Sequence, residues 1–278
     1  MSLENSFNKI LLAINYSHPA ASLLTQGNIQ IDRFKCPDWP DMIAEASRLC
    51  QVAVHSNLKA GRGNLGSKDW NSIMYLLELT QTPFLNLHLE TRTADFPDIP
   101  LDTTDPLHIE QIVERIVDDV KIAIHHFGEE KIILENVPYL GIDGKVLRPT
   151  VEPRVIYQVL EETDCGLLLD LSHARIASHH LEMDERAYLS ALPVERIREI
   201  HFTGVHNPDG FPQDHQEALE ADWALLEWVL ELIHTGKWPK PWLLAFEYGG
   251  VGEKFALRRN PQVIAEQTPK LYAMVNAT

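Results

Sequence analysis

Eight short apolar runs are spaced along almost the whole chain. They lack the strict polar–apolar alternation of a strand with one solvent-exposed face, so they predict strands that are buried on both faces. Each run is too short for a core helix. The runs are ILLAIN (10–15), IQIDRF (29–34), VAVHSNL (52–58), FLNLHLE (84–90), IILENV (132–137), GLLLDL (166–171), EIHFTG (199–204) and LLAFEY (243–248).

Helix-like segments separate these runs. Asp105 and Pro106 are typical of the cap and first turn of a helix, and they predict a helix that continues to about residue 126. Helical spacing of apolar residues also marks residues 69–80, 152–163, 183–192, 220–235 and 259–275. Strands that alternate with helices in 278 residues favour an α/β protein with a single (β/α)8 TIM barrel over residues 1–278. An open doubly wound sheet is the alternative.

Composition and charge exclude several classes of function. A formal net charge of −16 disfavours a protein that grips phosphate backbones, so we expect no nucleic-acid partner. No apolar run reaches the roughly 18 residues of a membrane span, so we expect no membrane partner. The three cysteines form no CxxC pair, and residues 1–19 lack the basic start of a signal peptide. These features predict a cytoplasmic protein.

Side chains that can bind metal ions recur at the C-terminal ends of the strand-like runs. In a barrel of parallel strands those ends meet at one mouth, where active sites lie. Imidazole and carboxylate groups suit zinc, iron and manganese. The candidates exceed the roughly four to six ligands of one ion, so we expect two or three divalent ions. The candidate ligands are His55, His88, Glu135, Asp170, His173, His201, Asp214, His215 and Glu247.

Asp170 and His173 raise a local question, because Asp170 ends an apolar strand and His173 follows three residues later. If the chain turns into a helix there, the spacing puts both side chains on one side, where they can share an ion or bind neighbouring ions. The alternative is that Asp170 caps that helix and His173 only covers the rim of the barrel.

The stretch Gly61–Gly66 matches the GxGxxG pattern of dinucleotide-binding loops. Those glycines must lie in the tight turn directly after the strand, whereas here the strand ends near residues 55–58. We therefore interpret the stretch as a flexible loop over the site, with Arg62 as a substrate contact.

Three stretches carry a resemblance to a known family: LENVPYL (134–140), GLLLDLSHARIAS (166–178) and YLSALPVERIREIHFTGVH (188–206). With the order of the ligands, they resemble the xylose-isomerase-like barrel superfamily and, most closely, the multinuclear non-heme iron-dependent oxidases. Better-known members of that family modify peptide cysteines during natural-product biosynthesis. The resemblance implies metal ligands, with iron favoured, at His55, His88, Glu135, Asp170, His173, His201, Asp214 and Glu247. One departure is Gln216, which stands where the superfamily has the histidine of an Asp-x-His motif. Either His215 takes over or one metal position is lost.

Three functions follow from these observations. The first is an iron-dependent oxidase of a peptide or small thiol substrate, with Glu135 and Glu247 as catalytic residues and with Arg62 and Asn136 in substrate binding. The second is a metal-dependent sugar or sugar-phosphate isomerase or epimerase, in which zinc or manganese polarises oxygens and a carboxylate moves the proton. The third is a barrel endonuclease, which the negative charge disfavours.

Overall fold

A computed structural model describes residues 9–207, 210–252 and 258–277 of the chain. The first eight residues of the stretch 1–19, which lacks the pattern of a signal peptide, lie outside the described residues. The chain divides into two compact units. The first unit comprises Met1–His55, Met74–Thr82 and Arg198–Thr278, and the second comprises Ser56–Ile73 and Pro83–Ile197.

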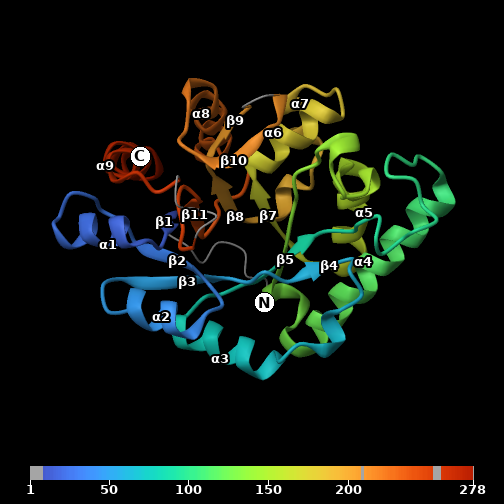
Figure 1. Ribbon diagram of the computed structural model, residues 1–278, viewed down its shortest axis with the longest axis horizontal. Helices are drawn as coiled ribbons and strands as arrows, with labels where there is room; N and C mark the ends of the chain where they lie inside the picture. The colour runs from blue at the N-terminus through green and yellow to red at the C-terminus, as the bar shows by residue number, and fades with distance from the viewer. Residues whose placement is uncertain (1–8, 208–209, 253–257, 278) are drawn as a thin grey trace. The chain divides into compact units, whose positions relative to one another are not determined.

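The first unit contains a parallel sheet in the order β3-β2-β1-β11-β8 (Figure 1). Its strands are β1 (Leu11–Asn15), β2 (Arg33–Pro37), β3 (Gln51–His55), β8 (Ile197–Phe202) and β11 (Leu243–Phe246). Its helices are α1 (His18–Thr25), α2 (Pro40–Ala46), α8 (Glu220–His234) and α9 (Pro261–Val275). Helix α3 (Trp70–Thr80) begins in the second unit and ends in the first.

The second unit contains a parallel sheet in the order β7-β6-β5-β4. Its strands are β4 (Lys59–Ala60), β5 (Leu85–Leu89), β6 (Ile132–Glu135) and β7 (Gly166–Asp170). Its α-helices are α4 (Pro106–Phe127), α5 (Pro153–Thr163), α6 (Leu171–His180) and α7 (Glu185–Ala191). Short 3-10 helices occur at Leu65–Ser67, Glu129–Lys131, Gly141–Asp143, Arg148–Val151 and Val194–Arg196.

Local sequence explains the boundaries of α4, the longest described helix. Asp105 caps its start, because the side chain accepts a hydrogen bond from the backbone N–H of Leu107 at 2.9 Å. The helix buries an apolar stripe that includes Ile112, Val113 and Ile116. Gly128 ends it with φ of 83°, a conformation that glycine adopts without a steric cost. The predicted helix of about residues 105–126 is therefore confirmed.

Seven of the eight predicted strands overlap β1, β3, β5, β6, β7, β8 and β11 over most of their length, whereas the strand predicted at 29–34 is wrong. The strand β2 begins only at Arg33. The carboxylate of Asp32 accepts a hydrogen bond from the backbone N–H of Leu12 at 2.9 Å, where a regular parallel sheet would have a backbone carbonyl of the neighbouring strand. Backbone pairing between β1 and β2 therefore starts one residue later, at Ala13 and Arg33. Ile29 and Ile31 are buried without being in a strand, which is why the sequence pattern misled.

Three strands were not predicted. The short β4 extends the sheet of the second unit beside β5. The strands β9 (Gly204–His206) and β10 (Gln213–Gln216) form an antiparallel hairpin after β8. The hairpin requires glycine at position 204, because a Cβ atom there would overlap the carbonyl group of Glu217 on the facing chain segment. The alternating strands and helices confirm the α/β class with parallel sheets, and the single closed (β/α)8 barrel stays a prediction.

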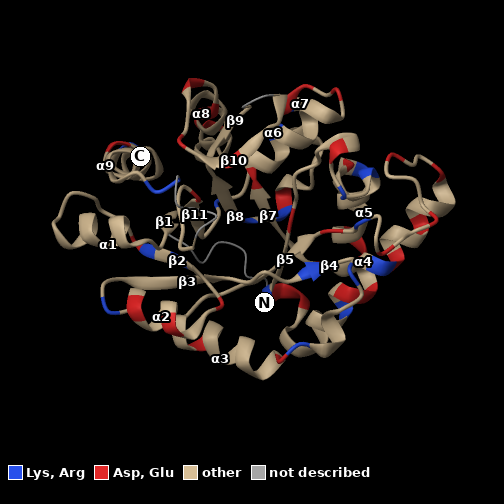
Figure 2. Cartoon of the chain, viewed as in Figure 1, with Lys and Arg blue, Asp and Glu red and all other residues tan. Residues whose placement is uncertain are grey.

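Acidic residues outnumber basic ones, and they lie largely on helices and connections (Figure 2). Within the described residues, no helix is both long enough and apolar enough to cross a lipid bilayer.

Candidate metal centre

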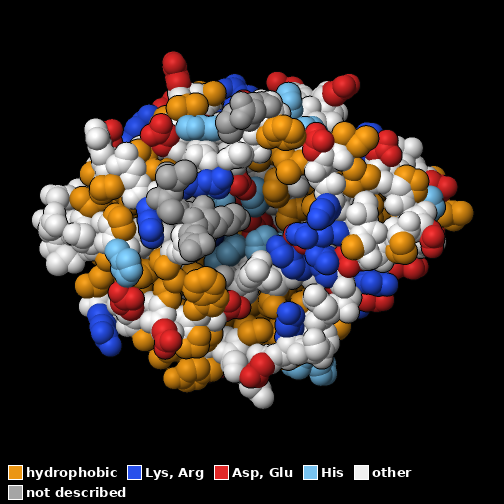
Figure 3. All heavy atoms as spheres, viewed as in Figure 1, with side chains coloured by type: hydrophobic (Ala, Val, Ile, Leu, Met, Phe, Trp, Pro, Cys, Tyr) orange, Lys and Arg blue, Asp and Glu red, His pale blue; other side chains and the backbone are white. Residues whose placement is uncertain are grey.

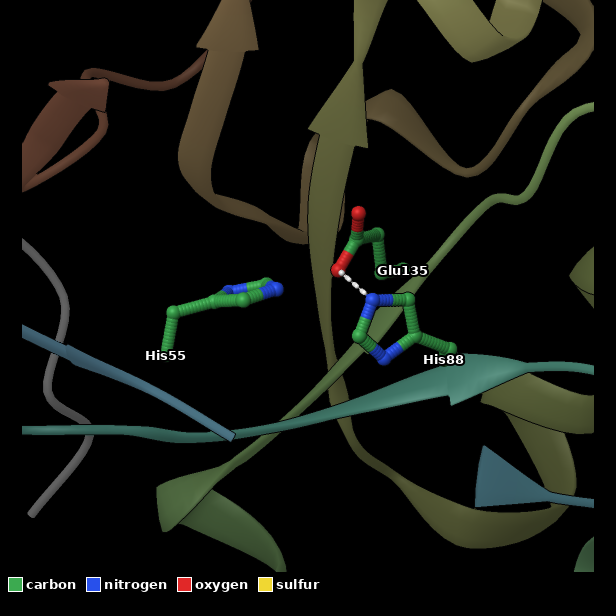
Figure 4. A group of neighbouring side chains, drawn as sticks. All are labelled: His55, His88 and Glu135. Carbon is green, nitrogen blue, oxygen red and sulfur yellow. Dashed lines mark ion pairs between the residues drawn. The ribbon is translucent and has the colours of Figure 1, made fainter. Parts of the chain in front are cut away.

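The second unit brings a histidine and a glutamate together at the ends of two neighbouring strands. His88 in β5 is in register with Glu135, the last residue of β6. The Nε2 atom of His88 lies 3.3 Å from the Oε2 atom of Glu135, the contact that Figure 4 draws as a dashed line. The Nδ1 atom of His88 faces the carbonyl oxygen of Leu58 at 3.1 Å. A metal-binding histidine usually donates one ring N–H to a backbone carbonyl or a carboxylate and binds the ion with its other nitrogen, so Nδ1 on Leu58 leaves Nε2 as the candidate metal-binding atom.

Asp170 has two roles at the end of β7. Its Oδ1 atom accepts a hydrogen bond from the backbone N–H of His173 at 2.8 Å and so caps α6. Its Oδ2 atom lies 3.4 Å from the Nδ1 atom of His173, and that nitrogen lies 3.6 Å from the Oε1 atom of Glu135. The helix-cap and ligand interpretations of Asp170 are therefore compatible, because they use different oxygen atoms.

Asn136 holds the ends of β6 and β7 together. Its side-chain amide donates to the carbonyl oxygen of Asp170 at 2.9 Å and accepts from the backbone N–H of Asp170 at 2.9 Å. The carbonyl oxygen of Asn136 lies 2.9 Å from the Nδ1 atom of His173. Asn136 thus fixes the orientation of both residues, and its contact with substrate stays a prediction.

The donor set of this unit fits a divalent metal ion. Glu135, Asp170 and His173 each offer a donor atom, and these atoms lie within 4.8 Å of one another. Both carboxyl groups are 1% exposed, and a bound cation would stabilise their negative charge in this buried position. An ion that binds two donors at about 2.1 Å holds them roughly 3 Å apart, close to the 3.3 Å between His88 and Glu135. We call His88, Glu135, Asp170 and His173 the second-unit ligand group.

A similar set of side chains lies in the first unit around Glu247, the residue after β11. The Oε1 atom of Glu247 lies 3.3 Å from the Nδ1 atom of His201, and its Oε2 atom lies 4.0 Å from the Nε2 atom of His215. The ring of His55, at the end of β3, lies 5.0 Å from the ring of His201. We call His55, His201, His215 and Glu247 the first-unit ligand group.

The hairpin β9–β10 orients His215. Its Nδ1 atom faces the carbonyl oxygen of Glu247 at 2.8 Å, and its backbone has φ of 55°. A non-glycine residue in this left-handed region costs about 1 kcal/mol or more, and such strain concentrates at functional sites. The role of His215 in place of the missing Asp-x-His ligand stays a prediction. The backbone carbonyl of Asp214 accepts from Arg258 at 3.3 Å, and a ligand role for Asp214 stays a prediction.

The sequence reasoning missed two charged residues in the first unit, Lys35 and Glu199. Glu199 shares a face of β8 with His201, and its Oε1 atom lies 2.8 Å from the Nε2 atom of that histidine. Burial raises the pKa of Glu199 to about 7, against the opposing effects of Lys35 and of a hydrogen bond from Trp242. Lys35 forms a buried ion pair with Glu247. Lys35 directly follows the apolar run 29–34 and Glu199 opens the run 199–204, so no motif marked either residue.

Arg62 belongs to a group of cations in the second unit. Lys59, Arg62 and Arg92 all form ion pairs with the buried Glu90, at 3.0, 3.1 and 2.8 Å. Figure 3 shows Lys and Arg side chains gathered over β4, the strand that contains Lys59. Lys59 is in register with His88, so these cations lie next to the second-unit ligand group. That placement supports Arg62 as a contact for an anionic part of a substrate.

Solved structures of sugar epimerases are similar to this chain in fold. D-psicose 3-epimerase from Clostridium cellulolyticum H10 matches with a TM-score of 0.56 and 11% identity, over 96% of this chain and 98% of the other. L-ribulose 3-epimerase matches with a TM-score of 0.56 and 13% identity, over 96% and 94%. A fusion protein with a xylose isomerase-like TIM barrel matches with a TM-score of 0.51 and 14% identity, over 95% and 44%. The fold is thus xylose-isomerase-like, as predicted.

Sequence comparisons give the family. A UPF0276 protein of Shewanella amazonensis is 34% identical over 119 residues, which are 42% of this chain and 41% of the relative. A UPF0276 protein of Acaryochloris marina is 35% identical over 107 residues, 38% of each chain. These matches span about two fifths of each relative. The model of the family described as RiPP precursor modification enzyme MbnB/TglH/ChrH matches residues 71–244, more than half of the chain. The chain belongs to this family, which confirms the predicted resemblance.

Proposed function

We propose that this protein is an iron-dependent oxidase that modifies a cysteine of a peptide substrate. The observation that carries the proposal is the second-unit ligand group, in which donor atoms of Glu135, Asp170 and His173 lie within 4.8 Å of one another. The chain is a member of a family of RiPP precursor modification enzymes. We expect two or three divalent ions in the chain, with iron favoured over zinc and manganese. The first-unit ligand group would supply the further donors.

The residues of the chain have distinct parts in this proposal. Bound iron would supply the redox chemistry. Glu135 has one carboxylate oxygen toward His88 and the other toward His173, so it is placed to bridge or orient ions. Asn136 and the cap of α6 hold Asp170 and His173 in fixed orientations, which lowers the cost of reorganisation when an ion binds.

Substrate binding is expected beside the second-unit ligand group. Arg62 pairs with Glu90 at 3.1 Å and with Asp95 at 2.6 Å, so its guanidinium is held in place while its side chain stays about a quarter exposed. A guanidinium has five N–H donors, and the remaining ones can bind a carboxylate of a peptide. We propose Arg62 as the contact that orients a peptide toward the metal ions.

A metal-dependent epimerase is the second candidate, which the similarity in fold to sugar epimerases favours. In that reaction, metal ions such as manganese or zinc would polarise neighbouring oxygens of a sugar, while Glu135 or Glu247 moved the proton. Both carboxylates are buried at the ends of strands, where such a base would lie.

The two candidates differ in what they consume. Protein loaded with Fe(II) without oxygen would be mixed with aerated buffer and either glutathione or a short cysteine-containing peptide. We expect dioxygen consumption with a change in the mass of the thiol compound, and none with a peptide that has serine in place of cysteine. Protein loaded with Mn(II) would be incubated with ketohexoses. Epimer formation there, without oxidation of any thiol, would overturn the oxidase proposal in favour of the epimerase.

A further inference from the structure

A buried lysine lies against the first-unit ligand group. Lys35 in β2 is 5% exposed, and its neighbours Phe34 and Cys36 are buried as well. Its ammonium forms an ion pair with the Oε1 atom of Glu247. The same oxygen atom lies 3.3 Å from the Nδ1 atom of His201. One carboxylate oxygen is therefore shared by a cation and a candidate metal ligand.

The sheet places this lysine and holds it in position. β2 pairs with β1 and with β3 in parallel register, and Lys35 is matched with Asn15 and with Ala53 in these two strands. A lysine within a strand flanked on both sides has little freedom to turn its ammonium into water. A buried ammonium needs a nearby counter-charge, and Glu247 provides it.

A metal ion and this ammonium would compete for one carboxylate. An ion bound to the Oε1 atom of Glu247 would lie within a few ångströms of the positive charge of Lys35, and like charges at that distance repel strongly in a buried site. The second-unit ligand group is different in kind, because Glu135 and Asp170 face the imidazoles of His88 and His173. An imidazole is itself a metal ligand, so it can bind an ion together with the carboxylate that it faces.

We propose that Lys35 is a resident cation that occupies Glu247 and weakens metal binding by the first-unit ligand group. The second-unit ligand group then binds a metal ion first, and the first-unit ligand group binds one only at higher metal concentration. This inference rests on the proposed metal-dependent function, and it adds a residue that sets how many ions the chain holds.

The test compares Lys35→Met with the parent in binding of Mn²⁺ and Co²⁺ to metal-free protein. Stoichiometry is measured by equilibrium dialysis and elemental analysis. We expect Lys35→Met to hold about one ion more at equal metal concentration, or to bind its weakest ion at least tenfold more tightly. The matched control is Lys9→Met, which removes a lysine of the same unit that pairs with Asp32 instead of a ligand, and which should leave metal binding unchanged. Equal or weaker binding by Lys35→Met would overturn the proposal.

A second readout does not depend on the number of ions. Without its lysine, Glu247 is a buried charge that lacks this counter-ion, so metal should stabilise Lys35→Met more than the parent. The rise in Tm on adding Mn²⁺ should therefore be larger in Lys35→Met, and also in Lys35→Gln if the first variant folds poorly. The double variant Lys35→Met with Glu247→Gln should lose this gain. A gain that survives in the double variant would mean that Lys35 acts elsewhere.

The outcomes separate this inference from the proposed function. If the parent holds two ions and Lys35→Met holds the same two with the same affinities, the role of Lys35 is wrong while the metal-dependent function stands. If the parent oxidises no thiol but Lys35→Met gains an ion, the oxidase proposal is wrong and the role of Lys35 stands.

Discussion

Asp170 shows how one side chain can serve both the fold and the site. One oxygen atom caps α6 and the other faces His173, within the second-unit ligand group. The sequence placed Asp170 at a strand end and predicted both interpretations, because a strand that ends in an acid and continues into a helix satisfies both patterns. The sequence could not show that the two oxygens divide these tasks, since that depends on the rotamer that Asn136 and α6 impose.

Asp170→Asn should separate these two tasks. Asparagine caps a helix about as well as aspartate, so the stability of the metal-free protein should change by less than about 0.5 kcal/mol or rise, because a buried charge near Glu135 is removed. The loss of the charged ligand should lower the bound metal by about one ion per chain. Urea unfolding and elemental analysis measure the two effects.

The control for this variant is Asp184→Asn, because Asp184 caps α7 in the same way and belongs to neither ligand group. It should leave both stability and metal content close to those of the parent. Parent-like metal content in Asp170→Asn would mean that Asp170 is a cap alone.

Lys35 and Glu199 mark the limit of prediction at the scale of residues. The strand-end histidines and carboxylates could be predicted, because parallel strands bring their C-terminal ends to one edge of a sheet. The two missed charges lie inside strands β2 and β8, next to buried apolar residues. An isolated charged residue at such a position belongs to no sequence motif. Its role can be inferred only from the residue that it contacts in the folded protein.

The loop between β4 and α3 is the element that the sequence predicted least well. It was expected to be flexible, yet the buried carboxylate of Asp119 in α4 accepts hydrogen bonds from the backbone N–H groups of Gly61 and Gly63, both at 2.8 Å. Gly61 has φ of 107°, and a Cβ atom there would lie 3.0 Å from the carbonyl oxygen of Glu90. These glycines therefore allow the backbone of the loop to pack closely against α4 and the end of β5. The spacing of the glycines in the sequence does not predict this packing.

Asp119→Ala should loosen this loop. It removes two charge-assisted hydrogen bonds and leaves two N–H groups without their acceptor, so the free energy of unfolding should fall by about 2–4 kcal/mol. Because the loop carries Arg62, the KM for a peptide substrate should rise more than kcat falls. Asp118→Ala is the matched control, since Asp118 is the exposed neighbour on the same helix and should change stability by no more than about 0.5 kcal/mol. Equal losses in the two variants would contradict the role of Asp119.

For the whole molecule, the class of fold was the easiest property to predict. Alternating apolar runs and helices depend on local periodicity, and the parallel sheets of both units confirm that inference. The position of β2 and the hairpin β9–β10 could not be predicted, because a carboxylate of Asp32 replaces a ladder partner and because β10 is entirely polar. The likeness in fold to a solved structure with a xylose isomerase-like TIM barrel agrees with the predicted fold class.

The negative charge of the whole chain supports the proposal that the protein binds divalent cations. The formal net charge is −16, and the buried carboxylates of Glu135, Asp170 and Glu247 contribute to it at positions where water cannot solvate them. Divalent ions would offset part of this charge, so metal removal should destabilise the protein. The Tm should fall on treatment with a chelator and return on adding Fe(II) without oxygen. An unchanged Tm would show that the carboxylates are compensated without metal.

The most direct measurement is the metal content of the protein purified without oxygen, beside that of Glu135→Ala. The account predicts two or more iron ions per chain in the parent and a loss of at least one ion in the variant, because Glu135 faces both His88 and His173. Circular dichroism would show that the variant keeps its fold. Less than one transition-metal ion per chain after loading with Fe(II), or equal metal content in the two proteins, would contradict a metal centre built on Glu135.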